Sequence, residues 1–207
     1  MKLIILMLGV LMSQLATAQD LAAGKVAYGI CASCHGAAGE GRAAMNSPAL
    51  AGQDADYLAR QLNHFKSGIR GAAPGDTFGA QMRGMAGTLA SDEAVTAVAA
   101  YLASLPAAVS TETLEADMRN GENQYNAYCG ACHGAQAQGN PALNSPRLAG
   151  LDRQYLARQL QNYAAGIRGN HADDRYGRQM KMMATVLPDD KAVADVLAFI
   201  VSQGSAQ

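Results

Sequence analysis

Apolar residues recur at helical spacing along most of this chain of 207 residues. Between Asp54 and Ser67 they fall three and four residues apart and Gly68 follows as a stop signal, so the pattern predicts a helix. A second helix is expected from Glu93 to Leu105, with Ser91 as a cap and Pro106 at its end. Further helices are expected over Asp20–Ile30, Asp152–Ala165 and Asp189–Ser202. No segment shows the alternation of a half-buried strand, so the pattern predicts an all-α protein.

Long glycine-rich loops separate the expected helices, from Gly36 to Gln53 and from Gly71 to Ala80. Loops of this length within a compact unit are usually functional or wrapped around something. The chain has no Trp and few aromatic residues, so two halves of ~90 residues have thin cores. We therefore expect a bound group to fill the middle of each half. Gly24, Tyr28 and Tyr101 are interpreted as packing residues between the first and last helices of the first half.

The N-terminal segment has the pattern of an export signal. Lys2 gives a positive start, residues 3–15 are mainly apolar, and Ala16-Thr17-Ala18 supplies small residues for cleavage. The apolar run is shorter than the ~20 residues that span a bilayer, so a retained membrane anchor is the weaker interpretation. We expect residues 1–18 to be removed as a signal peptide and the mature chain to be periplasmic. The formal net charge of −1 argues against a nucleic-acid partner.

The chain contains two copies of one unit, and the second copy follows the first after 98 residues. The matched segments are Cys31–Gly36 with Cys129–Gly134, Asn46–Pro48 with Asn144–Pro146, Tyr57–Leu62 with Tyr155–Leu160, Gly68–Gly71 with Gly166–Gly169, and Gln81-Met82 with Gln179-Met180. Two copies of this length are too few for a solenoid, so each copy forms its own domain. We expect domains at residues 19–105 and 117–207, joined by a linker at residues 106–116.

All four cysteines lie in two Cys-x-x-Cys-His motifs. This spacing is typical of c-type haem attachment, in which two thiols about a turn apart form thioethers and the adjacent histidine lies under the iron. A structural zinc site, a redox dithiol and two disulfides are the alternatives. Export, duplication and the repeated histidine together favour two covalently bound haem c groups. The expected attachment residues are Cys31, Cys34, Cys129 and Cys132, and the expected proximal iron ligands are His35 and His133.

An electron-transfer haem needs a sixth iron ligand, which is Met or His in cytochromes c. If both haems are alike, the ligand recurs in both copies, and neither His64 nor His171 has a histidine at its matching position. The recurrent methionines are Met82 with Met180 and Met85 with Met183. We favour the first pair, because each of its members follows a matching glutamine. The second pair stays open, with packing beside the haem as its other interpretation.

Further residues are expected to support the two haems. The second ring N–H of a ligating histidine needs an acceptor, and the carbonyls of Pro48 and Pro146 are candidates. Arg60 and Arg158 recur and are candidates to bind haem propionates, although an exposed position on a helix explains them equally well.

The haem motif near the start, Pro48-x-Leu50-x-Gly52 in the middle and a methionine before the terminal helix resemble class I cytochromes c. Two such units in one exported chain are similar to the di-haem cytochrome c4 family, over about residues 20–204. The resemblance implies two tandem all-α cytochrome domains, each wrapped around a covalent haem, with the haem edges facing a shared interface. It implies iron ligation by His35, Met82, His133 and Met180. The interval from the methionine to the last helix is one residue longer here than in the family.

The family passes single electrons from a quinol-oxidising bc complex toward haem–copper terminal oxidases and often associates loosely with the membrane. The resemblance therefore implies an electron carrier rather than an enzyme, in a periplasmic respiratory chain with redox proteins as partners. Two alternatives stay open. One is a cytochrome subunit tightly bound to a periplasmic dehydrogenase. The other is a catalytic di-haem enzyme, which needs an open iron site.

Overall fold

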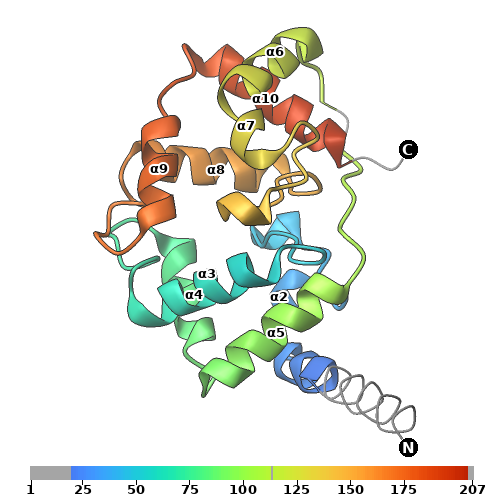
Figure 1. The fold of residues 1–207 in the computed structure, drawn as a ribbon, viewed down its shortest axis with the longest axis vertical. Helices are drawn as coiled ribbons and strands as arrows, with labels where there is room; N and C mark the ends of the chain where they lie inside the picture. Colours follow the sequence, from blue (N-terminus) through green and yellow to red (C-terminus); the bar gives the residue numbers. More distant parts are fainter. Residues whose placement is uncertain (1–19, 113, 205–207) are drawn as a thin grey trace, which may run out of the picture.

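The computed structural model describes residues 20–112 and 114–204, and this part of the chain is helical, with two isolated bridges and no longer strand (Figure 1). Residues 20–28 form the first helix. The first half continues with α2 (Ala32–His35), η1 (Ala43–Met45), α3 (Ala55–Ser67), α4 (Thr77–Ala86) and α5 (Asp92–Ser104). The second half contains α6 (Met118–Tyr128), α7 (Gly130–His133), η2 (Pro141–Leu143), α8 (Arg153–Ala164), α9 (Arg175–Met183) and α10 (Asp190–Gln203). The all-α prediction is confirmed. The expected signal peptide lies outside the described residues.

Short polar side chains cap the N-termini of the helices at the positions predicted from the sequence. The Asp54 carboxylate accepts from the Tyr57 backbone N–H at 2.8 Å and starts α3, which ends at Gly68 with φ 79°. Ser91 caps α5 in the same way, and Asp189 caps α10. The expected helices over these segments are therefore confirmed to within one or two residues.

The expected loop from Gly71 to Ala80 is wrong at its C-terminal end, because α4 begins at Thr77. The Asp76 side chain caps this helix through the Gly79 N–H at 2.9 Å. Two glycines within ten residues lower the helix propensity of the segment, which explains why the pattern did not predict it. The helix matters because it carries Met82 and Met85.

Each half has its own core, formed where its first helix crosses its last helix. A Cβ atom at Gly24 would overlap the Ala97 carbonyl, so only glycine permits this crossing. The Tyr28 and Tyr101 rings pack with their centroids 5.8 Å apart, which confirms the expected role of these residues. The second half repeats the crossing with Gly121 against Asp195 and with Tyr125 against Phe199 at 5.2 Å.

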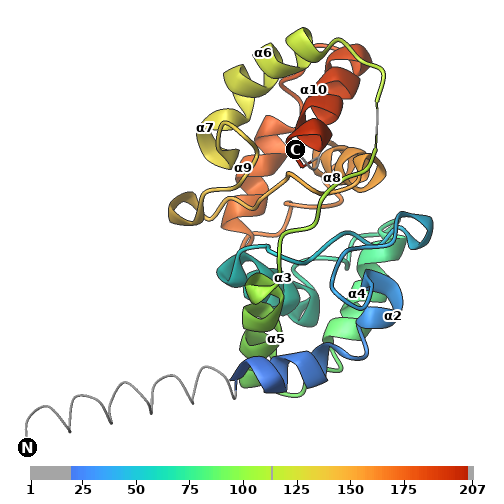
Figure 2. The same ribbon diagram turned by 90° about the vertical axis from the view of Figure 1, so that its right-hand side faces the viewer.

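The two halves stack on each other through α3, α8 and their neighbouring loops (Figures 1 and 2). The connecting segment runs along both halves: Ala107 packs beside Gly52, and the Ser110 N–H donates to the Gly204 carbonyl at 2.8 Å. Among the described residues, no helix has the length and apolar character needed to cross a bilayer.

Candidate functional site in each half

Each Cys-x-x-Cys-His motif forms one short helical turn. In the first half, the His35 and Cys34 backbone N–H groups donate to the Cys31 carbonyl at 2.9 and 3.1 Å, so both thiols and the imidazole belong to one turn. Cys129, Cys132 and His133 repeat these bonds at 3.0 and 3.1 Å. The turns therefore bring together the residues predicted to attach and ligate each haem.

The four cysteines are not joined in disulfides. Burial raises the pKa of Cys31 and raises that of Cys129 to about 11. Reactive dithiols instead have a thiol with a lowered pKa, so the surroundings of Cys31 and Cys129 do not favour a redox dithiol. Within residues 20–112 and 114–204, no group of three or more His, Cys, Asp or Glu residues could hold a metal ion by itself.

Both motif histidines are buried, and each has a defined hydrogen-bond partner. The Nδ1 atoms of His35 and His133 lie 2.9 Å from the carbonyl oxygens of Pro48 and Pro146, respectively. A carbonyl only accepts, so Nδ1 carries the proton and Nε2 keeps its lone pair. Burial lowers the pKa of both histidines, and the bond to the proline carbonyl opposes this only in part. The imidazoles are therefore neutral, which is the form that ligates a metal.

Buried tyrosines hold the turn that follows each histidine. The Tyr28 hydroxyl donates to the Gly36 carbonyl at 2.6 Å, and the Tyr125 hydroxyl donates to the Gly134 carbonyl at 2.6 Å. Gly36 itself adopts φ 86°, a backbone conformation that favours glycine. These hydrogen bonds fix the path of the backbone where it leaves each motif.

A cavity occupies the middle of the first half, and Tyr155, Arg158 and Gln159 of the second half close part of it. Cys31, Cys34 and His35 line it, and so do Met82 and Met85 on α4. The cavity therefore brings the thiols, the imidazole and both candidate methionines of the first half to one space with mostly apolar walls. In the second half, Met180 is partly buried whereas Met183 is 38% exposed. In the first half both Met82 and Met85 are partly buried, so exposure does not separate the two pairs there.

The residues present fit a c-type haem in both halves. Two thiols on one turn, a neutral imidazole beside them and a thioether on the facing helix are the donors that such a group uses. The aliphatic and aromatic walls of the cavity suit the apolar macrocycle. The expected bound group therefore has a cavity of suitable chemistry in the first half and a matching motif turn in the second.

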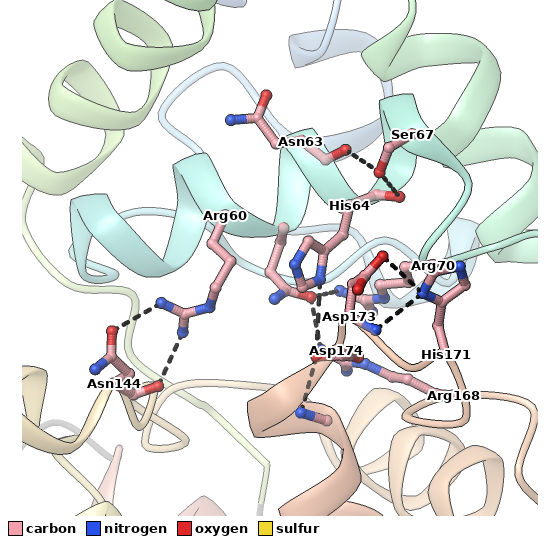
Figure 3. Close-up of polar contacts among 12 residues, drawn as sticks. Arg60, Asn63, His64, Ser67, Arg70, Asn144, Arg168, His171, Asp173 and Asp174 are labelled. Atoms are coloured by element: carbon pink, nitrogen blue, oxygen red, sulfur yellow. Dashed lines mark hydrogen bonds and ion pairs between the residues drawn. The ribbon is translucent and has the colours of Figure 1, made fainter.

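Arg60 and Arg158 reach across the interface between the halves, and Figure 3 shows this for Arg60. The Nη atoms of Arg60 donate to the side-chain and backbone oxygens of Asn144 at 3.0 and 2.9 Å. Arg158 makes the same pair of bonds to Asn46 at 3.0 and 2.8 Å. Their Nε atoms are buried without a hydrogen-bond partner. The Nη groups are thus used by the opposite half, and the contact with haem propionates stays a prediction.

Sequence reasoning missed a second pair of interface arginines, Arg70 and Arg168. Arg70 donates to the side-chain oxygens of Gln61 and Gln159 at 2.8 and 3.0 Å. Arg168 donates to the same two oxygens, each at 2.8 Å. Both arginines are almost fully buried. Their recurrence in the Gly-Ile-Arg-Gly segments was the available signal.

His64 lies in the same interface and not on the surface (Figure 3). Its Nδ1 atom is 3.8 Å from the Asp174 carboxylate, which is too long for a hydrogen bond. Burial lowers the pKa of His64, the Asp174 carboxylate raises it, and Arg60 lowers it further. The matching residue in the second half is Asn162, so this feature distinguishes the two halves.

Comparison with known proteins adds independent information. A family model described as Cytochrome c matches the chain twice, over residues 21–106 and 118–204. The chain is 33% identical over 193 residues to cytochrome c4 of Azotobacter vinelandii, covering 88% of this chain and 89% of that relative. It is 35% identical over 189 residues to a thiosulfate dehydrogenase electron acceptor of Stutzerimonas stutzeri (strain A1501), covering 86% and 82%. Reduced recombinant cytochrome c4 from Pseudomonas stutzeri has a similar fold, with a TM-score of 0.71 at 30% identity over 89% of this chain and 97% of that one.

Proposed function

Because the chain belongs to the di-haem cytochrome c4 family of cytochromes c, we propose that it carries single electrons in a periplasmic respiratory chain. Membership implies two covalently bound haem c groups, and the protein is a di-haem electron carrier that works with redox partners. The proposed donor is a quinol-oxidising bc complex, and the proposed acceptor is a haem–copper terminal oxidase. Export by a cleaved signal peptide at residues 1–18 and domains at residues 19–105 and 117–207 complete the proposal.

The proposed roles follow the residues of each motif. Thioether bonds form at Cys31 and Cys34 in the first half and at Cys129 and Cys132 in the second. The proposed axial ligands of the two irons are His35 with Met82 and His133 with Met180. The observation that carries this proposal is that each motif has a buried, neutral histidine whose Nδ1 is held by a proline carbonyl at 2.9 Å. The proton on Nδ1 leaves the Nε2 lone pair available to a metal, in a turn that also carries two free thiols.

The protein controls transfer through ligand geometry and through the lining of the cavity. Bound haem supplies reversible one-electron chemistry at its iron. The Pro48 carbonyl keeps the His35 ring in one orientation and increases its basicity as a ligand. Mostly apolar side chains line the cavity around Met82. If His35 with Met82 and His133 with Met180 held each iron in both oxidation states, the protein would be an outer-sphere carrier, whereas a catalytic di-haem enzyme would need an open position.

A second candidate donor has specific support from one relative. The protein of Stutzerimonas stutzeri that is 35% identical to this chain is named as the electron acceptor of thiosulfate dehydrogenase. The alternative function is therefore acceptance of electrons from a periplasmic dehydrogenase, as a tightly bound subunit. A complex that survives gel filtration from the native source supports this alternative, and an isolated monomeric cytochrome supports the respiratory carrier.

The first experiment measures haem content. Exported protein is purified and examined by mass spectrometry and by a pyridine haemochrome assay, with two c-type haems per chain expected. The ferrous protein is then mixed with carbon monoxide, and an unchanged spectrum at neutral pH is expected for two fully ligated irons. A bare peptide mass contradicts the whole assignment. Rapid carbon monoxide binding contradicts the carrier and favours the catalytic enzyme.

The second experiment separates the proposed donors. The oxidised protein is mixed in a stopped-flow instrument with a purified bc complex and quinol, and separately with thiosulfate dehydrogenase and thiosulfate. Faster reduction by the bc complex is expected. Preferential reduction by the dehydrogenase reverses the order of the two candidates.

A further inference from the structure

Each half of the molecule supplies an arginine that holds a loop of the other half. Arg158 lies on α8 of the second half, and both of its Nη atoms donate to Asn46 of the first half at 3.0 and 2.8 Å. Asn46 ends η1 in the left-handed conformation, with φ 57°. The Arg158 guanidinium also lies 4.5 Å from the centre of the Phe78 ring, which lines the first cavity together with Arg158 itself. The second half therefore forms part of the first site.

The loop held by Arg158 carries the acceptor of the proximal histidine. Arg42 and Ser47 exchange two backbone hydrogen bonds of 2.8 and 3.2 Å, which close a tight turn around Asn46. Pro48 follows directly, and its carbonyl accepts from His35 Nδ1 at 2.9 Å. Only one residue separates the clamped Asn46 from Pro48, so a displacement of Asn46 moves the oxygen that orients His35.

The opposite direction repeats the arrangement with the same atoms. Arg60 on α3 of the first half donates to Asn144 at 3.0 and 2.9 Å, and its guanidinium lies 4.7 Å from the centre of the Tyr176 ring. Asn144 has φ 55°, and the Pro146 carbonyl two residues later accepts from His133 Nδ1. The same chain of contacts, from arginine to asparagine to proline carbonyl to histidine, is therefore present at both sites.

We propose that Arg158 is a positioning residue for His35 and that Arg60 is a positioning residue for His133, so each half orients the proximal histidine of the other. This inference rests on the proposed function, in which both histidines ligate iron. The hydrogen bond from Nδ1 sets the orientation and basicity of such a ligand. The electron affinity of each iron therefore depends on the half to which its haem is not attached.

The guanidinium geometry explains why arginine occupies both positions. A planar fork reaches the side-chain and backbone oxygens of one asparagine at the same time, and its two bonds share one positive charge. Lysine keeps the charge but cannot make two parallel bonds. Replacing arginine with lysine therefore tests whether the two parallel bonds, and not the positive charge alone, hold the asparagine.

The test measures hydrogen exchange of the histidine ring N–H groups in the reduced, two-haem protein labelled with ¹⁵N-histidine. Wild type is compared with R158M, R158K, R60M and R153M. Arg153 is the matched control, because it lies exposed on α8. In R158M, exchange at His35 is expected to accelerate at least about tenfold, equivalent to about 1.4 kcal/mol, with His133 unchanged. R60M is expected to show the opposite selectivity, R158K to resemble R158M, and R153M to resemble wild type.

Several results overturn the proposal. Equal acceleration at both histidines in R158M indicates general loosening of the interface. Acceleration at His133 alone indicates an effect within the half that carries Arg158. Unchanged exchange, or full rescue by R158K, shows that the fork does not position the ring. The mass of the wild-type protein is measured first, so a missing haem counts against the proposed function and not against the arginine clamps.

Discussion

Replacing Tyr28 with phenylalanine tests whether the buried tyrosines stabilise the histidine turns. The Tyr28 hydroxyl donates to the Gly36 carbonyl at 2.6 Å, and the side chain is 2% exposed. Removing a buried partner and leaving an unpaired acceptor costs about 1–3 kcal/mol. The Gly36 carbonyl keeps only one further bond, from the Gly39 N–H at a long 3.3 Å. We therefore expect Tyr28→Phe to lower the free energy of unfolding by about 2 kcal/mol, in the middle of that range.

The second half provides an internal comparison for this prediction. The Gly134 carbonyl accepts from the Tyr125 hydroxyl at 2.6 Å and also from the Ala137 N–H at 3.0 Å, which is a better second bond than its counterpart. Tyr125→Phe should therefore cost about 1 kcal/mol, at the lower end of the range. Because burial raises the pKa of both tyrosines, both hydroxyls remain donors throughout the neutral range.

Guanidinium chloride titrations of the reduced two-haem protein, followed by far-ultraviolet circular dichroism, measure these losses. Tyr101→Phe is the control, because it keeps the aromatic ring beside Tyr28. A loss of less than about 0.5 kcal/mol is expected there, as for substitutions that remove no specific interaction. An equal loss in the control, or an unchanged midpoint in Tyr28→Phe, refutes the argument that the hydroxyl bond stabilises the turn.

Three further predictions follow from particular contacts. Gly121→Ala forces a methyl group against a backbone carbonyl of α10 and should destabilise the protein by about 1–3 kcal/mol in urea titrations. Gly84→Ala is the control, because it adds a methyl group in open space within α4 and should be neutral or stabilising. The pKa of the His64 ring, measured by NMR in the reduced protein, should lie below its ordinary value. Because the unfolded chain then binds a proton more readily than the folded chain, the free energy of unfolding should fall as the pH drops below about 6.5. A raised pKa contradicts this prediction. Met82→Ala and Met180→Ala should each remove half of the weak long-wavelength absorption band of the ferric protein, and if the other methionine pair has this effect instead, the ligand assignment is wrong.

Features encoded by local spacing could be predicted from the sequence alone. Two cysteines and a histidine within five residues necessarily lie on one turn if that turn is helical, and the structure places them so. Asp54 and Ser91 were recognisable as caps because capping depends on bonds to residues only three positions away. The α4 helix was not predicted, since its glycines and short length give a weak periodic pattern and its contacts with α3 stabilise it instead.

The interface could not be predicted, because its contacts join residues that are far apart in sequence. Arg60 and Arg158 recur in both copies, but recurrence alone does not distinguish a contact within one half from a contact with the other half. Their partners, Asn144 and Asn46, also recur in the sequence. Only the three-dimensional arrangement shows that each arginine bonds to the asparagine of the opposite copy.

Duplication explains why the centre of this interface is symmetric and why its edges differ. Two copies of one unit that pack face to face can form each contact in both directions. The clamps of Arg60 and Arg158 retain that reciprocity. At the edge, Gln53 exchanges two hydrogen bonds of 2.9 Å with the backbone of Arg147, whereas the matching Leu151 belongs to the second hydrophobic core. The reciprocal bonds of Arg60 and Arg158 fix how the halves pack, and the contact of Gln53 with Arg147, which has no counterpart at Leu151, gives the two sites different surroundings.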